Sequence, residues 1–185
     1  MKSNTGNYNV GNSGIISDET ITNLKPLSFQ TIADNETIEF IHWHCQKILE
    51  LSKEKNSSKE VARAINLHTY EVLGTIMGDA HSVDIDVLVH KMEKTEYAFL
   101  VMHNHPSNEH FSYRDLKTFI DSINITILIV IGNQGAVYII EKTKQLSLTE
   151  ILSVKKNLLN WKNGIIDYRK LLNQLSNYGI VYTAE

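Results

Sequence analysis

The chain of 185 residues is 42% hydrophobic and 21% charged. This composition supports a packed core and excludes a wholly disordered protein. The formal net charge is −3, whereas a dedicated nucleic-acid binder usually carries a surplus of positive charge, so we do not expect nucleic acid as a partner. Cys45 is the only cysteine, which excludes an intramolecular disulfide and leaves His, Asp and Glu as the main ligands for any metal.

Neither a signal peptide nor a membrane span is expected. The first 14 residues contain one lysine and no apolar core, unlike a secretory signal. The longest apolar run, residues 125–131, is much shorter than a helix that crosses a bilayer. We therefore expect a cytoplasmic protein with no membrane partner.

The N-terminal residues 1–35 are predicted to form a flexible arm. Residues 1–14 are rich in Asn, Ser and Gly, and such a segment buries too little surface to order itself. Residues 15–34 carry scattered apolar side chains without a sustained period. This second part could pack as an arm on the domain or on another chain.

A folded domain is predicted over residues 36–145, beginning with a helix and a hairpin. Apolar residues recur at helical spacing over residues 36–55, and Asn35 is the predicted N-cap. Residues 61–66 and 71–77 are strand-like and are joined by a short polar link, which indicates a β-hairpin. A second helix is expected from about residue 82 to residue 94.

The second half of this domain is predicted to be a buried strand, a helix and another hairpin. Residues 98–102 form a continuous apolar run, typical of a strand buried on both faces. Helical signals return after Ser112, and residues 125–131 and 136–141 flank a turn at residues 133–135. Residues 146–185 are predicted to be a helical C-terminal extension, with two helices interrupted near residues 163–164. This extension would pack on the core, or mediate homo-oligomer formation or the docking of a partner.

The end of the buried strand carries a candidate metal site. His103 and His105 are two residues apart, so on a regular strand their side chains point the same way. Ser112-x-x-Asp115 then marks the start of a helix that could bring Asp115 back opposite the histidines. Two histidines and one carboxylate, with water as the fourth ligand, is a common catalytic zinc arrangement. The alternative is a surface turn followed by a capping box between Ser112 and Asp115, which would leave the two histidines unexplained.

A hydrolytic site also needs an acid/base and an oxyanion donor. Glu60 and Glu71 stand at the heads of the two strands of the first hairpin, and Glu60 is favoured because small residues share its face of the strand. Ser112, one turn before Asp115, is a candidate donor to the oxyanion. His42 and His44 also lie close in sequence, but on a helix they point to different faces, so packing is the expected role for both.

These residues resemble the zinc motif of the JAMM (MPN+/JAB) metalloprotease family. The resemblance rests on His103-x-His105-Pro106-Ser107 followed by Ser112-x-x-Asp115. The resemblance extends over residues 60–142, and the motif residues are most similar to those of the bacterial RadC-like branch. In two places the chain departs from that branch, with Asn108 where glycine is common and Phe111 where proline is common. Asparagine tolerates the left-handed backbone conformation that glycine adopts.

The resemblance implies a fold and a function. The implied fold is an α/β (α+β) domain of the JAMM/cytidine-deaminase-like type, in which a curved mixed sheet lies between helices. The implied function is Zn²⁺-dependent hydrolysis of peptide or isopeptide bonds in a protein or peptide substrate, including ubiquitin-like proteins. His103, His105 and Asp115 would bind Zn²⁺, Ser112 would support the oxyanion and Glu60 would be the acid/base. The alternatives are a catalytically inactive MPN-like binding scaffold and a RadC-like nucleic-acid-associated protein.

Overall fold

Alternating and continuous apolar runs give the chain six strands, which pair into one open mixed sheet. The computed structural model describes residues 14–185, and within them the strand order is β2-β1-β3-β4-β5-β6. Only β3 and β4 are parallel, because a helix crosses between them. The strands are β1 (Val61–Asn66), β2 (Val72–Met77), β3 (Phe99–His105), β4 (Ile125–Gly132), β5 (Val137–Lys142) and β6 (Ile180–Ala184).

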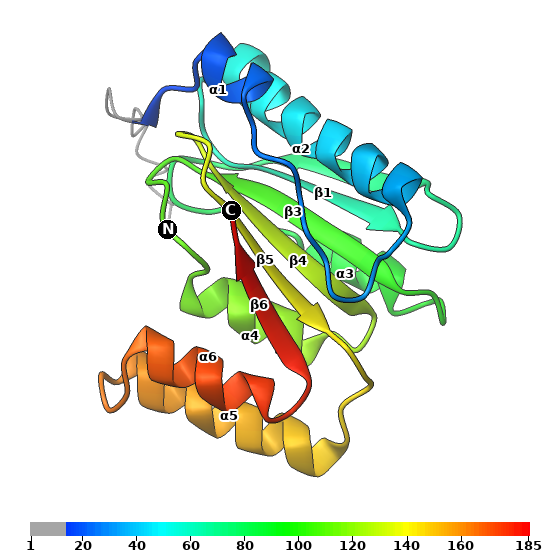
Figure 1. Ribbon diagram of the computed structural model, residues 1–185, viewed down its shortest axis with the longest axis vertical. Coiled ribbons are helices and arrows are strands. Elements are labelled where there is room, and N and C mark those ends of the chain that lie inside the picture. Colours follow the sequence, from blue (N-terminus) through cyan, green and yellow to red (C-terminus); the bar gives the residue numbers. More distant parts are fainter. Residues whose placement is uncertain (1–13) are drawn as a thin grey trace, which may run out of the picture.

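Helices cover both faces of the sheet, so the fold is α+β. Figure 1 shows α1 and α2 on one face, α3 and α4 on the other, and α5 and α6 beside α4. Within residues 14–185, no helix is both long enough and apolar enough to cross a bilayer. The helices are α1 (Asp18–Thr22), α2 (Asn35–Lys55), α3 (Asp86–Met92), α4 (Tyr113–Asp121), α5 (Leu148–Lys162) and α6 (Tyr168–Ser176).

The central strand β3 contributes to a hydrophobic core on each face of the sheet. All seven of its residues are buried. Leu100 and Met102 pack in the core beneath α2, and Phe99 and Val101 pack in the core formed with α4. This alternation confirms the sequence-based prediction of a strand buried on both faces. It also places His103 and His105 on the α4 side of the sheet.

Most predicted elements are confirmed, with local corrections at two helix starts. The N-cap of α2 is Asp34 rather than Asn35, because the Asp34 carboxylate accepts the backbone N–H groups of Glu36 and Thr37. Helix α3 begins at Asp86 rather than near residue 82. The backbone N–H groups of residues 81 and 82 instead donate to the carboxylate of Asp79, which holds that segment in a turn.

Residues 15–34 and the C-terminal helices both pack on the domain. Ile16, Ile21, Leu24 and Leu27 are buried in the core beneath α2, so residues 15–34 do pack on the domain; the predicted disorder of residues 1–13 falls outside the described residues. Helices α5 and α6 confirm the two predicted C-terminal helices. Strand β6 was not predicted, and it extends the sheet by pairing antiparallel with β5.

A buried network around Asn104 holds the end of β3 against the start of β1. Asn104 is fully buried and points to the face opposite the two histidines. Its Oδ1 accepts the backbone N–H of Val61 at 2.7 Å, and its Nδ2 donates to Asn133 Oδ1 at 2.7 Å and to Ser52 Oγ at 3.1 Å. The network therefore joins β3, β1, α2 and the β4–β5 turn.

We predict that Asn104→Ala lowers the free energy of unfolding by roughly 2–4 kcal/mol, because it leaves several buried polar groups without partners. Urea denaturation followed by circular dichroism measures the loss. Asn173→Ala, at an exposed position of α6, is the matched control and should be near neutral. Equal stabilities of the two variants would contradict the role given to the network.

A second buried polar contact lies on the α2 side of the sheet. Arg63 of β1 donates from its guanidinium to His44 Nδ1 at 2.7 Å and to Thr75 Oγ1 at 3.0 Å. Burial, with the nearby charge of Arg63, lowers the pKa of His44 to about 4. His42 instead contacts the carbonyl oxygen of Leu24. Both histidines therefore serve packing, as their sequence spacing predicted.

The lowered pKa of His44 predicts a pH-dependent contribution to stability. Between pH 6.5 and about 4 the unfolded chain protonates this side chain and the folded protein does not, so stability falls as the pH falls through this window. In the wild-type protein we expect the free energy of unfolding to fall by about 2 kcal/mol over this window. His44→Gln, which keeps an acceptor for Arg63, should not show this fall. Urea denaturation at pH 7, 5.5 and 4 tests this, and parallel profiles for the two proteins would contradict it.

Candidate metal centre

Three side chains that the sequence singled out converge at the carboxyl end of β3. His103 Nε2 and His105 Nε2 lie 2.9 Å apart. Asp115, in the first turn of α4, brings Oδ1 to 3.3 Å from His103 Nε2 and Oδ2 to 3.5 Å from His105 Nε2. The crossover from β3 into α4 therefore returns the aspartate to the histidines, as the spacing predicted.

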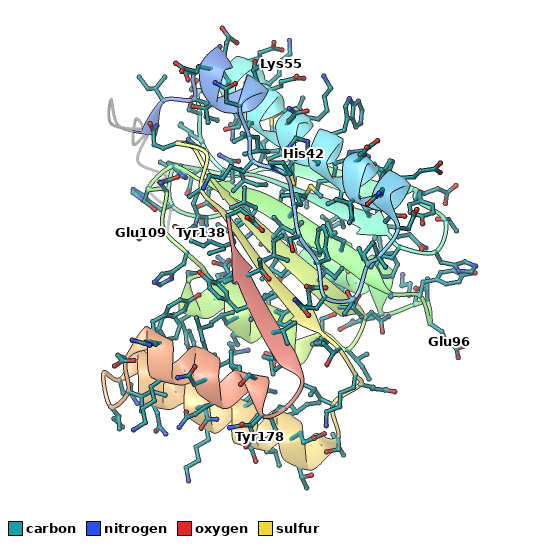
Figure 2. All side chains as sticks on the ribbon, in the orientation of Figure 1. His42, Lys55, Glu96, Glu109, Tyr138 and Tyr178 are labelled. Carbon is teal, nitrogen blue, oxygen red and sulfur yellow. The ribbon has the colours of Figure 1, made fainter. Side chains whose placement is uncertain are left out.

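The cluster lies at one end of the sheet. Glu96 shortly precedes β3 and Glu109 shortly follows it, and Figure 2 shows these two residues on opposite sides of the molecule. His103 and His105 are 4% and 8% exposed. The histidines are therefore buried in the protein but border the loop of residues 106–112, which contains Glu109.

The hydrogen bonds of His105 determine which ring nitrogen faces the cluster. His105 Nδ1 lies 3.1 Å from the carbonyl oxygen of Glu109. Since a carbonyl only accepts, Nδ1 carries the proton and donates, which leaves the lone pair of neutral His105 on Nε2. A histidine that binds metal through one nitrogen commonly donates from the other to a carbonyl or carboxylate. The orientation of His105 fits that pattern.

Asp115 also caps α4, which confirms the capping box that the sequence offered as the alternative. Its Oδ2 accepts the backbone N–H of Ser112 at 2.6 Å, and its own N–H donates to Ser112 Oγ at 3.2 Å. This reciprocal pair is a capping box. The cap fixes the carboxylate at the helix start, where it also faces both histidines.

Glu60 reaches the same cluster from the residue before β1. The backbone of Glu60 is held by hydrogen bonds with Gly78 and Asp79, and its side chain is buried with 6% of the residue exposed. Ligand atoms of Glu60, His103 and His105 all lie within 4.8 Å of one another. The register that pairs Ala62 with His103 explains this proximity, since β1 starts beside the end of β3.

Glu71, the other candidate acid/base from the sequence, lies elsewhere. Its carbonyl oxygen accepts the N–H of Asn66, the last residue of β1. Glu71 is exposed and therefore lies at the far end of the strand that Glu60 precedes. Of the two glutamates, the structure brings only Glu60 to the histidines.

The protonation of the cluster follows from burial and close charges. Burial raises the pKa of Glu60 above its usual value, and Asp115 and Asp79 add to the rise against the opposing effect of the two histidines. Burial would also raise the pKa of Asp115, but His103 and His105 outweigh it and hold that pKa well below its usual range. Burial lowers the pKa of His105, and contacts with Asp115 and Glu60 reverse this into a net rise. The pKa values of the two carboxyls are thus shifted in opposite directions, downward for Asp115 and upward for Glu60.

Asn108 shapes the loop between the histidines and α4. Its φ of 57° is left-handed, as expected where the resembling family commonly has glycine. Asn108 Oδ1 lies beside Gly132, where a Cβ would come within 1.8 Å of it. The side chain of Asn108 therefore fits in this loop because residue 132 is a glycine and has no Cβ.

The cluster opens into a cleft of about 530 Å³. Glu60, His105, Ser112 and Asp115 line its polar side, and Trp161 of α5 contributes to its lining as well. The sequence did not point to Trp161 as part of the site, because the C-terminal helices were expected to pack on the core, form a homo-oligomer or dock a partner. Its place in the cleft follows from the packing of α5 against α4, for which sequence periodicity carries no signal.

The donor set fits a divalent metal such as zinc. Imidazole nitrogens and a carboxylate are ordinary zinc ligands, and ligand atoms bound at about 2.0–2.1 Å in a tetrahedral arrangement lie about 3.3 Å apart. The two histidine nitrogens are 2.9 Å apart, and they lie 3.3 and 3.5 Å from the two different carboxylate oxygens of Asp115, all close to that value. Ligand atoms of Glu60 also lie within 4.8 Å of those of His103 and His105, so either carboxyl can complete a set of three with the two histidines.

The chain was compared with family models, curated proteins and solved structures, and it matches none of them. The resemblance to JAMM metalloproteases therefore remains a prediction that rests on the residues of the site.

Proposed function

We propose that the protein is a zinc-dependent hydrolase that cleaves peptide or isopeptide bonds. The observation that carries the proposal is the convergence of His103, His105 and Asp115 on one point, with the carboxyl of Glu60 beside them at the wall of a cleft. The capping box of Ser112 and Asp115 would not by itself require two histidines that face Asp115, or the buried carboxyl of Glu60 beside them. The JAMM family is the assignment that this arrangement supports best, and its RadC-like branch is the closest by motif.

His103, His105 and Asp115 would hold the metal. A bound Zn²⁺ supplies a Lewis acid that polarises a carbonyl and lowers the pKa of water to about 7. The carboxylate of Asp115 supplies negative charge to offset the cation, and the N–H of His105 bonded to Glu109 keeps its ring oriented toward the site.

Glu60 is proposed to move the proton. Because burial raises its pKa, this carboxyl can accept a proton from the attacking water and retain it long enough to pass it to the departing amine. The same residue thus acts first as base and then as acid. Ser112 lines the cleft beside Asp115, and its Oγ accepts a hydrogen bond in the cap. Its hydroxyl proton therefore remains free to donate to the oxyanion.

The first prediction of this proposal is metal content. Protein purified without chelator should contain close to one zinc ion per chain, measured by inductively coupled plasma mass spectrometry. The double variant His103→Ala/Asp115→Ala should lose it, because two of three ligands are removed. Absence of zinc in the wild-type protein, with no uptake on addition of zinc, would refute the metal site.

A second prediction separates Glu60 from the ligands. Glu60→Gln should retain zinc but lose at least about 100-fold in turnover, the usual contribution of a general acid/base. Asp115→Asn should instead weaken zinc binding. Glu71→Gln is the matched control, since Glu71 lies at the other end of β1, and it should keep wild-type activity on a panel of peptide and isopeptide substrates. Full activity of Glu60→Gln would remove Glu60 from the mechanism.

Zinc without activity on that panel would favour the alternative of an MPN-like binding scaffold. Such a scaffold would use the same cleft to bind a protein or peptide without cleaving it.

A further inference from the structure

An aromatic cluster joins the site loop to the C-terminal helices. The ring of His110 stacks on the ring of Tyr168, with centroids 3.6 Å apart and an interplanar angle of 4°. Trp161 lies 5.5 Å from Tyr168 and 6.5 Å from His110 between ring centroids. Tyr138 of β5 lies 6.4 Å from His110. The site loop, β5 and the two C-terminal helices therefore meet beside the candidate metal centre.

Tyr168 contributes to this cluster through its ring rather than its hydroxyl. The phenol oxygen is buried and has no hydrogen-bond partner among the described residues. A buried hydroxyl without a partner costs free energy, so hydrogen bonding does not explain the position of this side chain. Its position is explained by the stack with His110 and the contact with Trp161. The ring of Tyr168 thereby fixes the site loop on one side and Trp161 on the other.

Trp161 extends the cluster into the cleft of the metal centre. It is only partly buried, and it lines the cleft that Glu60, His105 and Asp115 also line. Pro106 and Tyr113 add to the apolar part of the lining. The Tyr113 ring is itself covered by Lys162, whose Nζ lies 4.5 Å from the ring centroid. The cleft therefore has a polar side that carries the reacting groups and an aromatic side to which α5 contributes Trp161 and α4 contributes Tyr113.

We propose that Trp161, positioned by Tyr168 and His110, forms a subsite that binds an aromatic or large apolar side chain of the substrate next to the cleaved amide. This inference rests on the proposed hydrolase function and adds a substrate preference to it. An aromatic face in a small cleft gains most from another flat or bulky apolar group, which displaces water from the indole surface. A polar or very small side chain of the substrate would leave the indole surface exposed to water.

Pairs of fluorogenic peptides test the proposal, with phenylalanine or alanine at the residue on either side of the cleaved bond. We expect the zinc-loaded wild-type protein to favour phenylalanine on one side by roughly tenfold or more in kcat/KM. Trp161→Ala should abolish that preference and keep its zinc, and Trp161→Phe should retain part of it. Leu159→Ala, which truncates an exposed residue of the same helix, is the control and should keep the preference.

A binding measurement keeps this test separate from the test of hydrolysis. The chain has two tryptophans, so Trp43→Phe leaves Trp161 as the single tryptophan, whose emission can be excited selectively. N-acetyl-phenylalaninamide should change the Trp161 emission at concentrations where N-acetyl-alaninamide does not. If no peptide is cleaved but this difference is seen, the hydrolase proposal fails and the subsite stands. Equal responses to the two amides, or an unchanged peptide preference in folded Trp161→Ala, would overturn the subsite.

Discussion

The alternation of side chains at the end of β3 is the constraint on which the site depends. His103 and His105 point to the α4 face, and Asn104 between them points to the α2 face. There Asn104 binds the N–H of Val61 and the side chains of Ser52 and Asn133. One tripeptide thus supplies two candidate ligands to one face and a structural anchor to the other. A slip of one residue in register would exchange these roles completely.

The anchor also positions the carboxyl that faces the histidines. The N–H held by Asn104 belongs to the residue after Glu60, so the network restrains the backbone from which Glu60 projects. On the other side of the cluster, the capping box with Ser112 restrains Asp115. Local hydrogen bonds therefore hold the backbone next to Glu60 and the carboxylate of Asp115. Such support from neighbouring groups is what holds a reactive constellation in one geometry.

The two carboxyls differ in environment, and this difference underlies their proposed roles. Asp115 faces both histidines, which stabilise its ionised form and lower its pKa. Burial dominates at Glu60 and raises its pKa. Pairs of carboxyls whose environments push their pKa values apart are common where one must stay charged and the other must exchange a proton. The C-terminal helices then complete the cleft on its aromatic side through Trp161.

The sequence by itself determined the local elements and the identity of the metal-binding candidates. Apolar periodicity predicted α2, β3 and the two C-terminal helices, and the two-residue spacing placed His103 and His105 on one face, because these signals are local properties of a strand or a helix. The residue pattern at 180–183, β-branched and aromatic after Gly179, was sufficient to suggest β6, although the helical reading of the tail obscured it.

Only the tertiary structure decided between Glu60 and Glu71, because that choice depends on which end of β1 lies beside the end of β3 in the antiparallel register. The stacking of Tyr168 on His110, the anchoring role of Asn104 and the position of Trp161 in the cleft likewise join residues distant in sequence. Side chains on different elements carry no common periodic signal, so their contacts emerge only when the helices and the sheet pack together.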